Sequence, residues 1–175
     1  MLSVLGLTAQ LLVAVPSDTP PPAPLLRQRV KAVEVGDWYN RRLTLHRRLS
    51  YATIPVFAFQ WTAGNQIWQK GSAAPAWART GHQVGAAAVA TIFTVNTITG
   101  VWNLWDSRSV PQGRKRRYAH AISMLVADAG FTWAGAVLSE RAERSTSDRE
   151  LHRKVALTCL GITVGSGVLM KLLNR

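Results

Sequence analysis

Four stretches of the chain carry almost no charged side chains, and each is close to the length of a membrane span. They are residues 49–69, 80–105, 118–139 and 155–170. A helix needs about 20 predominantly apolar residues to cross the roughly 30 Å hydrocarbon core of a bilayer. The fourth stretch is shorter, but the long stems of Lys154 and Lys171 at its ends can reach the interface. The pattern predicts an all-α protein, a transmembrane four-helix bundle with up-down-up-down topology.

Two other classes of protein fit the sequence less well. A soluble bundle would carry charges every three or four residues along the exposed face of each helix, and three of the four stretches carry none. The formal net charge of +12 suggests a nucleic-acid binder, but the most compact basic run, residues 113–117, lies in a short loop between two apolar stretches. There it is better explained as a signal for membrane orientation. We therefore expect membrane lipid, and no nucleic acid, as a partner.

Lysine and arginine are distributed unequally between the two sides that four spans would define. The N-terminal segment, the second loop and the C-terminus carry 14 of the 21 residues, and the first and third loops carry 7. Cytoplasmic loops hold the excess of these residues. We therefore expect an integral membrane protein of the bacterial inner-membrane type with both termini in the cytoplasm.

The chain ahead of the bundle divides into two segments. Residues 1–24 form an apolar segment and a proline-rich spacer, residues 25–44 are basic and juxtamembrane, and residues 45–175 form the four-helix domain. The apolar run 1–15 resembles the hydrophobic region of a signal peptide, which would place the residues after it outside. Against this interpretation, it has no positively charged start and no clear cleavage site follows it.

The four histidines of the chain each lie near the N-terminal start of a different apolar stretch. They are His46, His82, His120 and His152. Because successive helices run in opposite directions, His46 and His120 are expected near one membrane surface, and His82 and His152 near the other. In an up-down bundle the first and third helices face each other across the core, as do the second and fourth. The sequence therefore predicts two facing histidine pairs.

Two imidazoles that approach from opposite sides are the axial ligands of a six-coordinate haem iron. The single cysteine leaves no CxxCH attachment motif, so the haem would be non-covalent and b-type. A glycine also follows each histidine, by eighteen residues at Gly64 and Gly100 and by fifteen residues at Gly135 and Gly167. Small residues there would let a macrocycle approach the helix backbone. We predict two haem b groups, with the four histidines as metal ligands and these four glycines in the binding sites.

Three other roles are open to the histidines. Each histidine alone could simply be a polar residue at the membrane interface. A structural zinc ion needs four ligands in one place, whereas these pairs lie at opposite surfaces. A proton relay needs an acidic partner within the membrane, and Asp128 lies eight residues, about 12 Å of helix rise, beyond His120. The role of Asp128 stays open at this point.

The constellation resembles the cytochrome b561 family. The local phrases that carry the resemblance are LHRRLSYA at residues 45–52, GHQVG at 81–85 and LHRK at 151–154, and the likeness extends from about residue 45 to residue 172. Spacings of thirty-six, thirty-eight and thirty-two residues between successive histidines suit such a core. The resemblance implies four helices that bind two b-type haems, with one histidine per helix pairing first with third and second with fourth. Longer members of the family have further flanking helices, which this sequence does not show. The resemblance therefore does not specify the electron donor or acceptor.

By this resemblance the protein would be a transmembrane oxidoreductase that passes single electrons from a small-molecule or protein donor to an acceptor. Arg47 and Arg117 would hold haem propionates or attract an anionic donor, although membrane orientation or lipid headgroup contact is an alternative role. Two other functions stay open, namely a non-redox structural or assembly subunit and a membrane anchor that passes electrons to quinone. In each case the chain could act as a homodimer or as a subunit of a larger complex.

Overall fold

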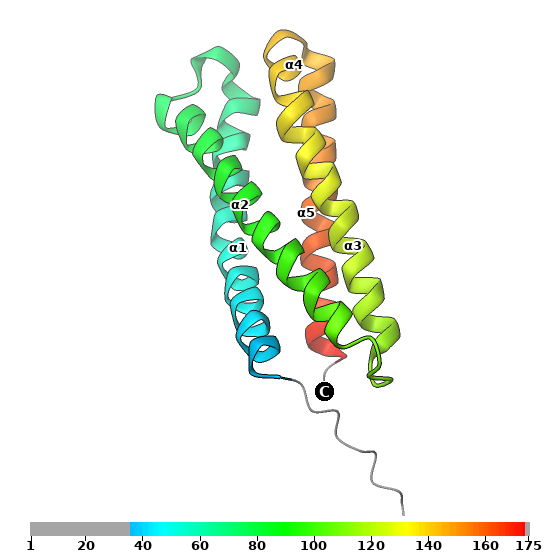
Figure 1. The fold of residues 1–175 in the computed structure, drawn as a ribbon. Coiled ribbons are helices and arrows are strands. Elements are labelled where there is room, and N and C mark those ends of the chain that lie inside the picture. The colour runs from blue at the N-terminus through cyan, green and yellow to red at the C-terminus, as the bar shows by residue number, and fades with distance from the viewer. Residues whose placement is uncertain (1–35, 174–175) are drawn as a thin grey trace, which may run out of the picture. The chain divides into compact units, whose positions relative to one another are not determined.

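The structure, a computed structural model, describes residues 36–173, and these residues are helical apart from short connections (Figure 1). The helices are α1 (Asp37–Lys70), α2 (Ala76–Asp106), α3 (Arg114–Trp133), α4 (Ser139–Arg144) and α5 (Thr146–Leu172). A 3₁₀ turn, η1 (Gly71–Ala73), follows α1, and a π-helical turn, η2 (Ala134–Leu138), joins α3 to α4 without a break. The described residues contain no β-strand, and the predicted all-α helical bundle is confirmed.

Local sequence signals set the ends of these helices. Gly71, which follows α1, and Gly113, which precedes α3, have φ values of 54° and 66°, a region that glycine adopts without a steric penalty. Pro75 precedes α2, at a position where a backbone N–H would have no acceptor within the helix, so that its absence costs no hydrogen bond. Ser145 caps α5 by accepting a hydrogen bond from the backbone N–H of Asp148.

The helices form two antiparallel hairpins. α1 packs mainly against α2, and α3 packs mainly against α5, while α2 also contacts α3 (Figure 1). The hairpins meet at three phenylalanine rings, Phe57 of α1, Phe93 of α2 and Phe131 of α3, whose centroids lie 5.2–6.2 Å apart. Ala127 of α3 and Cys159 of α5 are buried beside them. These contacts form the middle of the bundle.

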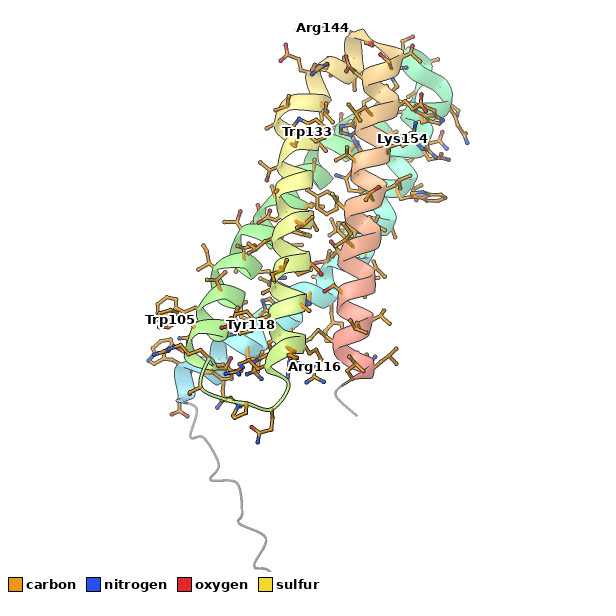
Figure 2. The ribbon with its side chains drawn as sticks, turned by 90° about the vertical axis from the view of Figure 1, so that its right-hand side faces the viewer. Trp105, Arg116, Tyr118, Trp133, Arg144 and Lys154 are labelled. Atoms are coloured by element: carbon orange, nitrogen blue, oxygen red, sulfur yellow. The ribbon has the colours of Figure 1, made fainter. Side chains whose placement is uncertain are left out.

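Three helical segments are long and apolar enough to cross a membrane, by length and composition. They are α2, the continuous segment Arg114–Arg144 and α5. Large apolar side chains lie exposed along these segments, as lipid-facing surfaces require. Figure 2 places Trp105, Arg116 and Tyr118 near one end of the bundle, and Arg144 and Lys154 near the other. This pattern is consistent with a membrane protein.

The first of the four predicted spans is not among these segments. α1 has 34 residues, but the amide side chains of Gln60, Asn65 and Gln66 lower the hydropathy of its apolar half. Two of these amides are turned toward the bundle. Gln60 donates a hydrogen bond to the carbonyl of His82, and Asn65 accepts one from Arg153. Of the four predicted spans, three are long and apolar enough to cross a membrane, and α1 is not among them.

The predicted segments at the N-terminus fall largely outside the described residues. This applies to residues 1–24, with the signal-like run 1–15, and to the first part of the basic segment 25–44. The described part of that segment is helical from Asp37, so α1 begins nine residues before His46. The proposed domain boundary at residue 45 lies inside this helix.

Candidate functional site

The structure brings the four histidines together in two facing pairs. The ring centroids of His46 on α1 and His120 on α3 lie 6.3 Å apart, with 80° between the ring planes. The centroids of His82 on α2 and His152 on α5 lie 6.2 Å apart, with 65° between the planes. α1 is thus paired with α3, and α2 with α5, the fourth long helix. This is the pairing of first with third and second with fourth span that the sequence predicts.

These separations can be compared with the geometry of a metal held between two imidazoles. A metal–imidazole nitrogen bond is about 2.0 Å long. In a five-membered ring with bonds near 1.33 Å, a ring atom lies about 1.1 Å from the centroid. Two imidazoles on opposite sides of one metal therefore have centroids about 6.2 Å apart. Both histidine pairs match this separation, so each pair has the ring spacing that two imidazole ligands of one metal would have.

Within the first hairpin, each histidine lies against a glycine of the other helix. A Cβ at Gly100 of α2 would be 3.2 Å from Cε1 of His46, and a Cβ at Gly64 of α1 would be 3.2 Å from Cε1 of His82. Both values are tighter than normal contact, so the absence of a side chain makes room for each imidazole. The relationship is reciprocal, because each helix supplies one histidine and one glycine.

The spacing between histidine and glycine on each helix explains this reciprocity. Eighteen residues are five turns of an α-helix, so His46 and Gly64 share one face of α1, and His82 and Gly100 share one face of α2. The same spacing corresponds to about 27 Å of helix rise. The two histidine pairs are therefore separated by most of the roughly 30 Å thickness of a hydrocarbon core.

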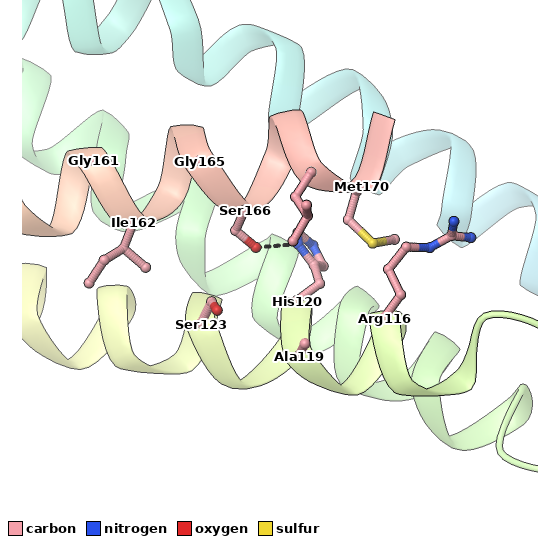
Figure 3. Close-up of a pocket in the computed structure, with 10 residues that line it drawn as sticks. Arg116, Ala119, His120, Ser123, Gly161, Ile162, Gly165, Ser166 and Met170 are labelled. Atoms are coloured by element: carbon pink, nitrogen blue, oxygen red, sulfur yellow. Dashed lines mark hydrogen bonds between the residues drawn. The ribbon is translucent and has the colours of Figure 1, made fainter. Parts of the chain in front are cut away.

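In the second hairpin the partner of each histidine is a hydrogen-bonding group. Nδ1 of His120 lies 2.8 Å from the hydroxyl of Ser166 on α5 (Figure 3). Nδ1 of His152 lies 3.0 Å from the carbonyl oxygen of Ala134, the first residue of the π-helical turn. Ser166 and Ala134 each lie fourteen residues after the histidine of their own helix. In this hairpin too, each helix supplies one histidine and one group that contacts the histidine of the other helix. The contacting groups are a hydroxyl and a carbonyl instead of two glycines.

The Nδ1 atoms of three histidines have hydrogen-bond partners on a neighbouring segment. Nδ1 of His46 lies 3.2 Å from the carbonyl oxygen of Asn96 and 3.3 Å from the hydroxyl of Thr99. Nδ1 of His82 is buried and has no hydrogen-bond partner among the described residues. A histidine that donates its Nδ1–H to a carbonyl presents a lone pair at Nε2, which is the form that binds a metal.

The predicted glycines separate into two groups. Gly64 and Gly100 contact histidine rings, whereas a Cβ at Gly135 or Gly167 would meet nothing within 4 Å. Fifteen residues are about 4.2 helical turns, so these two glycines are rotated by about 60° from the histidine of their own helix. One position earlier on each helix, the structure has Ala134 and Ser166 facing the histidines.

The two predicted arginines lie in different surroundings. Both terminal nitrogens of Arg117 donate to carbonyl oxygens between α2 and α3, so this guanidinium holds the loop together. The acceptors are Ser107, Val110 and Gln112. Arg47 is exposed on α1 beside His46. The structure therefore commits Arg117 to its loop and leaves Arg47 at the surface.

A cavity of about 300 Å³ lies between α3 and α5 beside His120 (Figure 3). Small side chains on both helices create it, among them those of Ala119, Ser123 and Ser166, together with Gly165. It reaches from His120 toward the first turn of α3. Because His120 lines it, the cavity belongs to the site of the His46–His120 pair.

Sequence reasoning missed the groups that hold the histidines. Ser166, Asn96, Thr99 and the carbonyl of Ala134 are not singled out by composition, and the signal for Ser166 and Ala134 is their shared spacing from a histidine on the same helix. Within residues 36–173, no group of three or more His, Cys, Asp or Glu side chains gathers as a metal site. Each candidate centre therefore offers two histidine ligands.

Comparison of the chain with protein-family models, with curated proteins and with solved structures finds no match.

Proposed function

We propose that this protein carries electrons across a membrane through two non-covalent b-type haems. His46 and His120 would hold one group, and His82 and His152 the other. The observation that supports this proposal is the separation of the ring centroids, 6.3 Å and 6.2 Å, which suits one metal between two imidazoles in both pairs. When bound, haem iron would supply the ability to accept and release single electrons.

The chain itself would hold and orient the ligands. Hydrogen bonds from Nδ1 to Asn96, Ser166 and Ala134 fix the orientation of three of the imidazoles. Such bonds also raise the basicity of Nε2, which favours the oxidised metal. The two pairs are separated by about 27 Å of helix rise along α1 and α2 and by about 21 Å along α3 and α5, so an electron that passes from one to the other would travel most of the way across the bilayer.

We further propose that α1 crosses the membrane beside the three apolar helices, with both termini in the cytoplasm. The length of α1 and the inward hydrogen bonds of Gln60 and Asn65 support the first point, and the excess of Lys and Arg on one side supports the second. A reporter fused after residue 175 should report the cytoplasmic side. Reporters fused ahead of residue 36 and within the loop 71–75, which flank α1, should report opposite sides of the membrane. Reports from the same side would remove α1 from the set of spans.

The experiment that tests the function is a reduced-minus-oxidised absorbance spectrum of the detergent-purified protein, with haem quantified per chain. Material produced with an adequate haem supply should show sharp b-type bands and about two haems per chain, one for each histidine pair. A flat spectrum from a folded, haem-replete preparation would reject the proposal. It would favour a non-redox membrane subunit whose histidines only pack the bundle.

A further inference from the structure

Asp128 is the only acidic residue in the four apolar stretches of the chain. It lies on α3 at the middle of the stretch 118–139, and its Oδ2 accepts a hydrogen bond of 2.9 Å from the hydroxyl of Thr97 on α2. This bond connects the two hairpins. Ionisable residues at this depth are rare in membrane helices and usually belong to ion or proton pathways.

The position of Asp128 is between the two histidine pairs. On α3 it lies eight residues after His120 and six residues before Ala134, whose carbonyl contacts His152. These intervals correspond to about 12 Å and about 9 Å of helix rise. On α2 its partner Thr97 directly follows Asn96, whose carbonyl contacts His46. A change of charge at either pair would therefore act on Asp128 through a short length of apolar protein.

Few other ionisable groups lie at this depth. The described helices carry no Lys or Arg at the level of Asp128, because the charged residues of α1, α2 and α5 lie toward the helix ends. Besides those charged residues and Tyr39 near the start of α1, the titratable side chains of the four long helices are the four histidines, Tyr51 on α1, Tyr118 on α3 and Cys159 on α5. The charge at the histidine pairs is therefore the main variable that acts on this carboxyl group.

We propose that Asp128 is a proton-binding site that responds to the redox state of the two centres, an inference that rests on the proposed function. Oxidised groups held by the two histidine pairs would place positive charge on both sides of Asp128 along the bundle. Delivery of one electron by an external one-electron reductant to a group held by a histidine pair would lower that positive charge by one unit. The carboxylate then takes one proton from water and becomes a neutral carboxylic acid. Transfer of the electron to an external acceptor returns the proton to water.

A purely structural role for Asp128 makes a different prediction. The bond from Thr97 also joins the hairpins, as polar side chains commonly do between membrane helices. Asp128→Asn keeps the size of the side chain and an oxygen that accepts from Thr97, but it removes the titrating group. Asp128→Ser is a second variant without a titrating group, and Asp128→Glu restores one.

The test is a redox titration of the full chain in detergent at a series of pH values, after haem has been quantified in each variant. For a one-electron couple, a tenfold change in proton concentration shifts the midpoint by at most about 59 mV. The native chain and Asp128→Glu should show a midpoint that falls as pH rises. Asp128→Asn and Asp128→Ser should lose most of this slope while they retain haem.

Proton uptake measured with an indicator dye in weakly buffered solution gives a second readout. Reduction of the native protein should consume protons, and reduction of Asp128→Asn should consume fewer. Equal slopes and equal proton uptake in haem-loaded native and Asp128→Asn proteins would overturn the inference and leave the proposed function standing. A native chain that binds no haem would overturn both, because no electron would then reach the site.

Discussion

Gly64 of α1 lies against the imidazole of His82 so closely that a Cβ at position 64 would be 3.2 Å from Cε1 of that ring. Gly100 of α2 stands in the same relationship to His46, at the same distance. The first hairpin therefore positions one histidine of each candidate centre by contact with a glycine of the neighbouring helix. The second hairpin positions the other two ligands with a hydroxyl and a carbonyl group.

Substitution of either glycine should affect one centre and spare the other. Gly64→Ala should displace His82 and lower the haem content of the His82–His152 site, because a Cβ contact of 3.2 Å forces the ring to move by a few tenths of an ångström. Gly100→Ala should do the same to the His46–His120 site. Haem per chain and the band positions of the reduced-minus-oxidised spectrum measure the effect.

The same bundle offers a matched control for these glycine variants. A Cβ at Gly135 or Gly167 would meet nothing within 4 Å, so Gly135→Ala and Gly167→Ala should retain the haem content and spectrum of the native protein. Equal losses from all four substitutions would show that glycine acts through general helix packing and not through the histidine rings.

Single histidine substitutions should divide the haem content in half. His46→Ala or His120→Ala should remove one haem, and His82→Ala or His152→Ala the other, because each substitution removes one of the two imidazoles that would hold the group in the proposed function. The double variant of His46 and His120 should bind about as much haem as either single variant, since residues that share one site are not additive.

Gln83→Ala is the control for the histidine variants, because Gln83 is exposed and directly follows His82. It should retain both haems. Full haem content in all four single histidine variants would contradict the ligand assignment.

The sequence predicts the bundle well because charge-free stretches report directly on helices that face lipid. Three of the predicted stretches lie inside α1, α2 and α5, and the third in chain order lies inside the continuous segment Arg114–Arg144. The start of α1 is missed for the same reason. Residues 37–48 include four arginines, which interrupt the apolar pattern without interrupting the helix, because charged side chains at a membrane surface are solvated.

The candidate site is only partly readable from the sequence. One histidine per helix and the alternation of helix direction are enough to predict both pairs. Gly64 and Gly100 share a helix face with their histidines, and Gly135 and Gly167 do not, so the periodicity of the helix separates the two groups. The acceptor at Ala134 cannot be predicted in this way, because every residue has a carbonyl group and the π-helical turn changes the local register.

Ser166 should tune the centre that contains His120. Ser166→Ala removes the oxygen that lies 2.8 Å from Nδ1 of His120, so the imidazole loses orientation and basicity. We expect the affinity for haem at this site to fall by about 10–100-fold, the usual effect of losing a partner of a metal-binding histidine. The midpoint potential of this centre should rise, because a less basic ligand stabilises the oxidised metal less.

Ser123→Ala tests whether this effect is specific. Ser123 lines the same cavity beside His120, and it forms no hydrogen bond to a histidine within residues 36–173. In haem titration and redox titration, Ser123→Ala should have the haem affinity and midpoint potential of the native protein, whereas Ser166→Ala should differ from it in both. Identical behaviour of the two serine variants would assign the effect to the cavity and not to the hydrogen bond.

The contact between Gly130 of α3 and Cys159 of α5 should limit the stability of the second hairpin. A Cβ at Gly130 would overlap Sγ of Cys159, whereas the next nearest atoms, Cβ of Cys159 and Cγ1 of Val155, would both be 3.9 Å away. Gly130→Ala should therefore destabilise the protein by about 1–3 kcal/mol, the usual cost of an overpacked core.

Removal of the sulfur should relieve that overlap. Cys159→Ala, added to Gly130→Ala, should recover most of the lost stability, so the two substitutions should show a coupling free energy when unfolding is followed by denaturant titration in detergent. Gly161→Ala on α5 is the control, because a Cβ there would meet nothing within 4 Å. If the loss of unfolding free energy in the double variant equals the sum of the losses in the two single variants, the two helices do not meet at these residues.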